Sequence, residues 1–288
     1  MFETRKIFAI VLSFLLTSTF AFAAQDQQIA QKLAALEKIQ RKFTFVVIGD
    51  NRSGDDIYRK LVALAMEHKA DFMLNTGDLI ATPGDLKEWA KFWEMSKPIT
   101  VPYFLTVGNH DAHSKTPGSE QIYKQQVDLP GNELHYSFIA GNSLFIVLDS
   151  CLDVQEKKIT GEQYKWLEGI LANAAQKHKF VFVHHPLYTV KGKGKHAGNS
   201  MDRYPGERDR LQALFVKYNV ELVSTGHEHL YERKSVDGVT HIITGGGGAP
   251  LYADEKDGGF NHFIVVTVDG DKVSAEVVDG NNKVRDRF

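Results

Sequence analysis

The sequence contains a single cysteine, Cys151, among its 288 residues. No disulfide can therefore form within the chain, so its stability has to come from a hydrophobic core and from any bound metal. The formal net charge is only −2, which gives no overall field to attract nucleic acid or an anionic membrane surface. Hydrophobic residues make up 43% of the chain, enough for a core, which excludes a disordered protein.

Two common signatures of hydrolases and nucleotide-binding proteins are also missing. The sequence has no Gly-x-Ser-x-Gly string, and Cys151 lies in LDSCLD without an obvious paired histidine, which argues against a serine or cysteine hydrolase. The glycine run at 245–248 is not part of a Gly-x-x-x-x-Gly-Lys-Ser/Thr string, so it does not predict a nucleotide P-loop.

Residues 1–23 are predicted to be a signal peptide. Arg5 and Lys6 precede an apolar run over 7–20, and Ala21-Phe22-Ala23 is typical of a cleavage site. A membrane anchor is the alternative, but the run is shorter than the ~20 residues needed to span a bilayer. We expect cleavage near Ala23, a periplasmic or secreted protein, and no transmembrane span in the mature chain.

Residues 24–42 are predicted to form a helical leader and residues 43–288 a single α/β domain, because short apolar β-branched runs alternate with helical stretches. Thr160 and Gln163 resemble a capping box, and Asp269-Gly270-Asp271 predicts a hairpin turn. The expected strands are 43–48, 71–75, 103–107, 143–148, 180–183, 220–224, 263–268 and 272–278. The expected helices are 55–68, 85–96, 161–176 and 207–218.

Five of the apolar runs end in residues that can bind metal. The runs are FTFVVIGD, DFMLNTGD, PYFLTVGNHD, FVFVHHP and VELVSTGHEH, which end at Asp50, Asp78, Asn109-His110, His184-His185 and His227 to His229. Ligands of open α/β sheets bind beyond the carboxyl ends of the strands, so these side chains are expected to converge on one crevice. A glycine precedes four of the five groups and permits a tight turn.

Each of these motifs has an ordinary explanation when it is taken alone. A Gly-Asp pair after a strand is usually a turn, and the two histidines of a His-x-His segment lie on the same side of an extended chain without needing a metal. The five motifs together, in this order, resemble the calcineurin-like metallophosphoesterase superfamily. The strings VHHPLY, GHEHLYER and ITGGGGAPLY are similar to its purple acid phosphatase-like branch.

The resemblance, from about residue 43 to the C-terminus, implies a four-layer α/β/β/α sandwich of two mixed sheets flanked by helices, with the 245–248 run as a structural turn near the site. It implies a dinuclear centre in which Asp78 bridges two metals. Asp50 and His229 would bind the first metal, and Asn109, His184 and His227 the second. Carboxylate, carboxamide and imidazole ligands suit Mn, Fe or Zn. Two ions roughly 3.5–4 Å apart would supply a metal-bound hydroxide to attack a small-molecule or other phosphate ester, without nucleic acid or an identified protein partner.

The leaving group of such a reaction needs a proton. His110 is a suitable catalytic donor because the reference pKa of histidine is near 6.5. Asp111 is expected to orient the His110 ring and to support its protonated form.

Two positions depart from the family pattern. Arg52 stands where the first motif has a histidine, and Ala81 stands where purple acid phosphatases have a tyrosine, so their charge-transfer colour is not expected. Three alternatives follow: Asp50, Asp78, His229 and water hold the first metal; His262 substitutes as a ligand; or only one metal binds tightly. Arg52 is either a phosphate clamp or a loop arginine paired with Asp55 or Asp56.

Three further features have both a functional and an ordinary interpretation. His185 contacts substrate or supports a ligand, or else it packs against the turn at Pro186. His196, Arg203 and Arg208, in or just after the long loop over 191–205, cover the phosphate, or else they are solvated loop charges. A non-catalytic metal- or phosphate-binding protein is the alternative function, although the intact His110-Asp111 pair argues against it.

Overall fold

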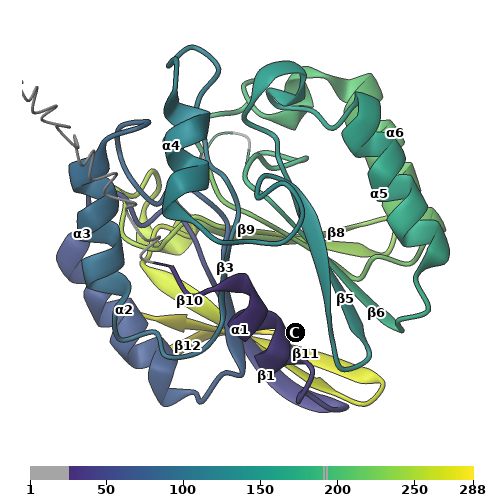
Figure 1. The fold of residues 1–288 in the computed structure, drawn as a ribbon, viewed down its shortest axis with the longest axis horizontal. Coiled ribbons are helices and arrows are strands. Elements are labelled where there is room, and N and C mark those ends of the chain that lie inside the picture. Colours follow the sequence, from purple (N-terminus) through teal and green to yellow (C-terminus); the bar gives the residue numbers. More distant parts are fainter. Residues whose placement is uncertain (1–25, 191, 193) are drawn as a thin grey trace, which may run out of the picture.

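The computed structural model describes residues 26–190, 192 and 194–288. The predicted signal peptide lies outside the described residues. Two mixed sheets of six strands each form the centre of the molecule, and helices flank them (Figure 1). The predicted α/β sandwich of two mixed sheets is therefore confirmed.

The first sheet has the strand order β12-β11-β10-β1-β2-β3. Strands β1, β2 and β3 run parallel, while β10 to β12 are antiparallel to their neighbours. The predicted C-terminal hairpin is β10 and β11, paired from His262 opposite Asp279 to Asp269 opposite Lys272. The strands are β1 (Lys42–Ile48), β2 (Phe72–Asn75), β3 (Tyr103–Leu105), β10 (His262–Asp269), β11 (Lys272–Asp279) and β12 (Val284–Arg287).

The second sheet has the strand order β4-β5-β6-β7-β9-β8. Its four central strands β5, β6, β7 and β9 are parallel, and the edge strands β4 and β8 are antiparallel to their neighbours. The carboxyl ends of β5, β6 and β7 therefore open at one edge of the sheet. The strands are β4 (Tyr136–Ala140), β5 (Ser143–Leu148), β6 (His178–Val183), β7 (Leu222–Thr225), β8 (Tyr231–Val236) and β9 (Val239–Thr244).

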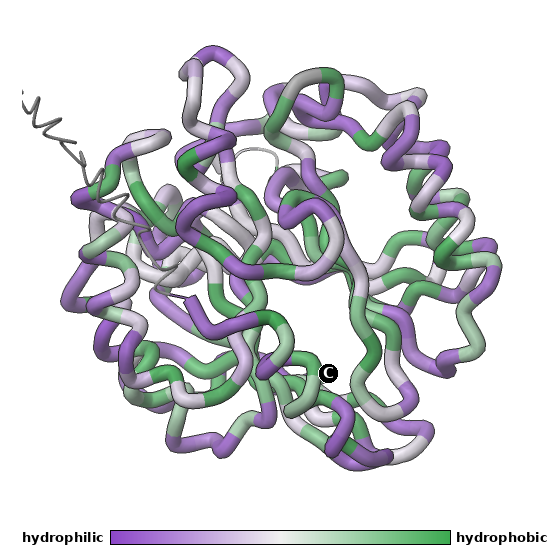
Figure 2. Tube along the Cα trace, viewed as in Figure 1, coloured by the Kyte–Doolittle hydropathy of each residue, from purple (hydrophilic) through white to green (hydrophobic). Residues whose placement is uncertain are grey.

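Helices cover the outer face of each sheet, with α2 and α3 on one side of the molecule and α5 and α6 on the other (Figure 1). Hydrophobic stretches run along the strands, and hydrophilic stretches recur along the outer helices (Figure 2). Among the described residues, no helix has both the length and the apolar character needed to cross a membrane. The helices are α1 (Ile29–Leu36), α2 (Asp55–Glu67), α3 (Leu86–Ser96), α4 (Ser119–Gln126), α5 (Gly161–Asn173) and α6 (Pro205–Lys217).

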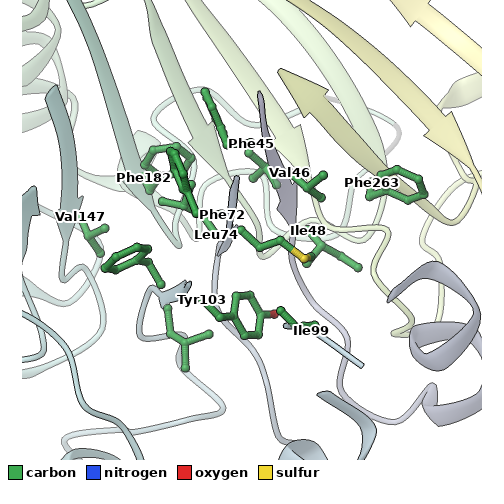
Figure 3. Packing of buried hydrophobic residues seen from close by; sticks show 14 of the residues in the cluster. Phe45, Val46, Ile48, Phe72, Leu74, Ile99, Tyr103, Val147, Phe182 and Phe263 are labelled. Carbon is green, nitrogen blue, oxygen red and sulfur yellow. The ribbon is translucent and has the colours of Figure 1, made fainter. Parts of the chain in front are cut away.

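The pleat of β6 divides its side chains between two hydrophobic clusters. Phe180 and Phe182 belong to the core between the sheets, whereas Val181 and Val183 pack in the cluster under α5 and α6, as the alternation of a strand requires. Aromatic rings fill the space between the sheets, where Phe45 lies 6.5 Å from Phe182, centroid to centroid (Figure 3). This rigid core fixes the strand ends that carry the site.

The expected leader helix is present as α1, and a buried ion pair holds it against the domain. Lys32 Nζ lies 2.6 Å from Asp26 Oδ2 and donates to the carbonyl of Asp128 at 3.0 Å. The predicted capping box is wrong, because the Thr160 side chain makes no cap hydrogen bond with α5. Gln163 instead bonds the backbone N–H and C=O of Asp149.

Candidate metal centre

Three of the predicted ligands share an unusual backbone conformation directly after a strand. Asp50, Asp78 and His227 have φ values of 56°, 58° and 67°, in the left-handed region that non-glycine residues rarely occupy. Such strain concentrates at functional sites because the surrounding fold over-determines it. Here it turns each residue off the end of β1, β2 or β7 and holds it in the buried cluster.

Close backbone approach explains two of the glycines that precede these ligands. Gly77 has φ +98°, and a side chain on it would press against the backbone of Gly108 and the His184 ring. A side chain on Gly108 would overlap the Asp78 carboxylate. Only glycine fits at both positions, as the sequence predicted.

The first predicted metal site is assembled from three buried side chains. Ligand atoms of Asp50, Asp78 and His229 all lie within 4.8 Å of one another. His229 Nδ1 is 2.8 Å from the carbonyl of Pro250, and a carbonyl only accepts, so this nitrogen carries the proton. The lone pair on Nε2 then faces Asp50 Oδ1 at 3.5 Å. Acceptor atoms that face one another fit a cation between them.

The second predicted site has a similar arrangement around His184. His184 Nδ1 is 2.9 Å from the carbonyl of Thr76, which leaves the Nε2 lone pair free for a ligand role. Nε2 lies 3.1 Å from Asn109 Oδ1 and 3.3 Å from Asp78 Oδ1. Asp78 therefore contributes to both groups, as the bridging role requires.

His227 lies beside His184, with the two ring centroids 5.1 Å apart, and has an unsatisfied nitrogen. Its Nε2 is buried and has no hydrogen-bond partner among the described residues, although such atoms normally find one. Burial, together with His185 and His184, lowers the pKa of His227 well below its usual range. The ring is therefore neutral at pH 7, the form that binds a metal. Its backbone N–H donates to both oxygens of Asp50 at 3.0 Å.

The His110 ring has a different partner from the one predicted. His110 Nδ1 lies 2.6 Å from the carbonyl of Ala81. Asp111 is fully buried, and its two oxygens accept four backbone N–H groups. These come from Asp78 at 3.0 Å, Gly108 at 2.7 Å, Leu79 at 2.7 Å and Ile80 at 3.2 Å.

The prediction that Asp111 orients the His110 ring is therefore wrong. Asp111 holds together the loops that carry Asp78 and Asn109, because all four of its partners are backbone donors of those loops. Burial and the neighbouring Asp78 carboxylate raise the pKa of Asp111, although the backbone donors of Gly108, Ile80 and Leu79 act in the opposite direction.

Arg52 lies inside the site. Its Nε is 3.2 Å from Asp78 Oδ2, and its side chain is only 16% exposed. Asp55 pairs with Lys91 and Asp56 with Arg59, so the alternative of a solvated loop arginine is wrong. Burial alone would raise the pKa of Asp78, but His184, His110 and Arg52 together outweigh it and bring that pKa to about 2.

The structure also bears on His262, the alternative ligand for the first metal. His262 Nε2 is 3.1 Å from Thr244 Oγ1, and Nδ1 is 2.9 Å from the carbonyl of Phe260. Both ring nitrogens already have partners within the fully buried core. Of the three alternatives, the one with Asp50, Asp78 and His229 therefore fits this arrangement better than the substitution by His262.

His185 lies behind the ligands. It is 1% exposed, its Nδ1 is 3.0 Å from Ser150 Oγ, and its ring centroid is 4.4 Å from that of His227. This burial favours support of a ligand over contact with substrate. The substrate-contact role stays a prediction.

The long loop brings one of its three candidate residues to the site. The ring of His196 lies 4.0 Å from that of His227, and Glu228 fixes it there by accepting the N–H groups of Lys195 at 2.9 Å and His196 at 3.0 Å. The role of Glu228 had no sequence signal beyond its place within the His-x-His motif. Arg203 and Arg208 lie instead over the rings of Tyr204 and Tyr188.

A hydrogen-bonded network below the cluster supports two of the ligand loops. Asn75 Nδ2 donates to Asn51 Oδ1 at 2.9 Å and to Tyr103 Oη at 2.9 Å, and Asn75 Oδ1 accepts Gly77 N–H at 2.9 Å. Tyr103 Oη is in turn 3.1 Å from Tyr58 Oη. Buried networks of this kind rigidify a site when every member has a partner.

Sequence reasoning did not single out Tyr252. Its ring stacks on His229 with centroids 4.0 Å apart at 22°, and its hydroxyl is 3.4 Å from His229 Nε2. Burial raises the pKa of Tyr252 to about 12. The residue lies within the string ITGGGGAPLY, which drew attention for its glycines. Gly247 N–H donates to the carbonyl of Gly49 at 2.8 Å, in agreement with a structural turn next to Asp50.

Comparison with known proteins agrees with this geometry. The chain belongs to the calcineurin-like phosphoesterase family, whose model matches residues 43–231. It is 28% identical over 222 residues to "Probable inactive purple acid phosphatase 1" of Arabidopsis thaliana, with 64% of this chain and 35% of that protein covered. It is 28% identical over 252 residues to "Phosphoenolpyruvate phosphatase" of Allium cepa, with 75% and 49% covered.

A solved structure gives the same picture for the fold. The purple acid phosphatase PPD1 from yellow lupin (Lupinus luteus) seeds superposes with a TM-score of 0.71 at 21% identity, covering 86% of this chain and 53% of that one. The chain thus spans between a third and about half of these relatives. The predicted family is confirmed, and relatives that are named purple acid phosphatases agree with the predicted branch.

Proposed function

We propose that this chain is a metal-dependent phosphoesterase with a dinuclear centre. The observation that carries the proposal is that five strand ends bring the predicted ligands together around one of them, the Asp78 carboxylate. Ligand atoms of Asp50, Asp78 and His229 lie within 4.8 Å of one another. His184 Nε2 lies 3.3 Å from Asp78 Oδ1 and 3.1 Å from Asn109 Oδ1. Imidazoles, a carboxamide and carboxylates in such an arrangement suit Mn, Fe or Zn.

Two bound ions would activate water and offset the charge of the phosphate oxygens during an in-line displacement. Other residues of the protein hold the proposed metal ligands in place before any ion binds. Asp111 fixes the Asp78 and Asn109 loops through four backbone hydrogen bonds, and Asp50 accepts the N–H of His227. Such preorganisation removes the reorganisation that would otherwise raise the barrier.

His110 is our candidate for the proton donor to the leaving group. The carbonyl of Ala81 accepts from Nδ1 at 2.6 Å, which keeps a proton on that nitrogen because a carbonyl only accepts. Nε2 is then the nitrogen that releases a proton and later recovers it. The backbone N–H of His110 also donates to Asp78 Oδ1 at 3.0 Å. This hydrogen bond connects the proposed proton donor to the proposed bridging ligand.

Arg52 and His196 are our candidates for contact with the phosphate. Arg52 is partly exposed beside Asp78, and its planar fork can bind two phosphate oxygens. His196 lies against His227 on the loop that Glu228 anchors. Burial, with His229 and His184 nearby, lowers the pKa of His196 to about 4, so it acts as a neutral hydrogen-bonding group at pH 7.

The experiment that tests the proposal is turnover of p-nitrophenyl phosphate and its bis ester. The purified protein is assayed before and after chelation, and again after Mn, Zn or Fe is restored. We expect chelation to abolish hydrolysis and metal to restore it. Hydrolysis that survives exhaustive chelation would contradict the proposal. So would the absence of hydrolysis of both esters with every metal tested.

One observation favours a second candidate, a non-catalytic metal- or phosphate-binding protein. The guanidinium of Arg52 forms an ion pair with the Asp78 carboxylate, which the first metal of a dinuclear centre would also have to bind. A protein that binds metal or inorganic phosphate yet hydrolyses neither ester would be this second candidate.

We also propose that the protein is exported. The basic start, the apolar run and the Ala-x-Ala string of residues 1–23 support this. Intact-mass analysis of protein from separated cell fractions tests it: loss of about the first 23 residues in the periplasmic or secreted fraction agrees, and a full-length chain in the cytoplasm contradicts.

A further inference from the structure

We propose that the phenol oxygen of Tyr252 is an additional ligand of the first metal, in the site that Arg52 leaves one ligand short. This inference rests on the proposed dinuclear centre. The side chains of Asp50, Asp78 and His229 supply three ligands. A fourth protein ligand would complete a tetrahedral set.

The hydroxyl of Tyr252 lies where such a ligand is needed. It is 3.4 Å from His229 Nε2, and Asp50 Oδ1 is 3.5 Å from the same nitrogen. Two ligand atoms that each lie about 2.1 Å from one ion at a tetrahedral angle are about 3.4 Å apart. Both separations therefore match ligands that share one ion.

The proton on His229 supports the same arrangement. Its Nδ1 donates to the carbonyl of Pro250, so Nε2 has only a lone pair to offer. In the metal-free protein the Tyr252 hydroxyl can donate to that lone pair. An ion bound to Nε2 would use that lone pair, so the Tyr252 hydroxyl would lose its acceptor. Its oxygen could then bind the ion instead.

The backbone holds Tyr252 in this position. Tyr252 N–H donates to the carbonyl of His229 at 3.1 Å, and Ala249 N–H donates to the carbonyl of Asp50 at 2.8 Å. The segment that carries Tyr252 is therefore fastened to two of the three other ligands. Ligands need such support to keep their geometry.

Coordination breaks the phenolic O–H bond, forms one oxygen–metal bond and releases the proton to water. This gives a spectroscopic readout that does not depend on turnover. A metal-bound phenolate absorbs in the near ultraviolet as tyrosinate, and with Fe(III) it adds a visible charge-transfer band. The colour that Ala81 made unexpected would then come from Tyr252.

The test compares wild type with Tyr252→Phe and with Tyr218→Phe, a control at the C-terminal end of α6. Phenylalanine keeps the ring that stacks on His229, and circular dichroism checks the fold. Metal-depleted proteins are titrated with Zn(II) and Fe(III) while absorption and metal content are measured. We expect both bands in wild type and Tyr218→Phe, their loss in Tyr252→Phe, and first-site affinity weakened about tenfold or more.

The inference would be overturned if the wild type bound metal without a tyrosinate signal. It would also be overturned if Tyr252→Phe kept both the absorption signal and the metal affinity of the wild type. Ester hydrolysis is measured in the same samples, so the two proposals can fail separately. Restorable hydrolysis without the bands leaves the enzyme proposal standing and removes Tyr252 as a ligand. The bands without hydrolysis support Tyr252 as a ligand and contradict the enzyme proposal. A wild-type chain that binds no ion contradicts both proposals.

Discussion

The guanidinium of Arg52 lies 3.2 Å from the Oδ2 atom of Asp78, the carboxylate that is proposed to bridge two metals. A permanently charged group therefore occupies the position where the family pattern has a histidine ligand. We therefore expect Arg52 to lower the affinity of the proposed first site for a cation and to offer a donor fork to phosphate.

Arg52→His is expected to tighten the first metal site by about tenfold, because the change removes a competing cation and adds an imidazole ligand. The same change should raise KM for phosphate esters, since the fork is lost. Calorimetric titration with Zn(II) and steady-state kinetics measure the two effects. Arg59→His on α2 is the control, because Arg59 is 51% exposed and faces only Asp56. Unchanged metal affinity in Arg52→His would show that the guanidinium does not compete.

Asp111→Asn is expected to lower the free energy of unfolding by about 2–4 kcal/mol, because both carboxylate oxygens accept backbone N–H groups and asparagine has only one acceptor oxygen. Urea unfolding of the metal-free protein measures it. Asp85→Asn is the matched control. Its Oδ1 atom alone accepts both cap hydrogen bonds of α3, so the change should be under about 0.5 kcal/mol. Equal effects at the two positions would contradict the assigned role of Asp111.

His110→Ala is expected to reduce kcat by about 10²–10⁴-fold for esters with poor leaving groups and much less for good ones. A donor matters most where the leaving oxygen is most basic. The measurement is kcat across aryl and alkyl phosphates, with His113→Ala as the control, since His113 Nδ1 only receives the N–H of Lys115. An equal loss across the series would mean that His110 shapes the site without donating a proton.

The pKa of Asp78 predicts a pH dependence of stability in the metal-free protein. Its folded-state pKa of about 2 lies below the usual value of about 3.9, so ionised Asp78 stabilises the fold above about pH 4. That stabilisation, about 2.5 kcal/mol at most, is lost as the pH falls towards 2. The difference in unfolding free energy between wild type and Asp78→Asn should shrink over this range. A difference that stays constant from pH 5 to about pH 2 would argue against a depressed pKa.

The strand ends could be predicted because each β-branched or aromatic run ends in polar residues, which a glycine precedes in four of the five runs. Strand β5 has the predicted bounds, and β1, β2 and β7 differ from prediction by one or two residues at their ends. The β8–β9 hairpin was missed although Asp237-Gly238 at its turn is a recognisable signal. Helix α4 was missed because SEQIYKQQ buries only Ser119 and Tyr123, too few for an apolar stripe.

The partners of the site residues were harder to predict than their identities. The carbonyl of Ala81 accepts from His110, and Asp111 accepts from the backbone, because the loop after β2 folds back on the loop after β3. No spacing in the sequence encodes that contact. Tyr252 was missed for the same reason, since it reaches His229 through a loop that returns to Asp50.

The central claim is that two metal ions share the Asp78 carboxylate. The measurement that tests it most directly is anomalous X-ray diffraction from crystals of the protein loaded with Mn or Zn. We predict two anomalous peaks roughly 3.5–4 Å apart, one beside Asp50 and His229 and the other beside Asn109, His184 and His227. A single peak with the Arg52 guanidinium in place of the first ion, or no peak at Asp78, would contradict the dinuclear account.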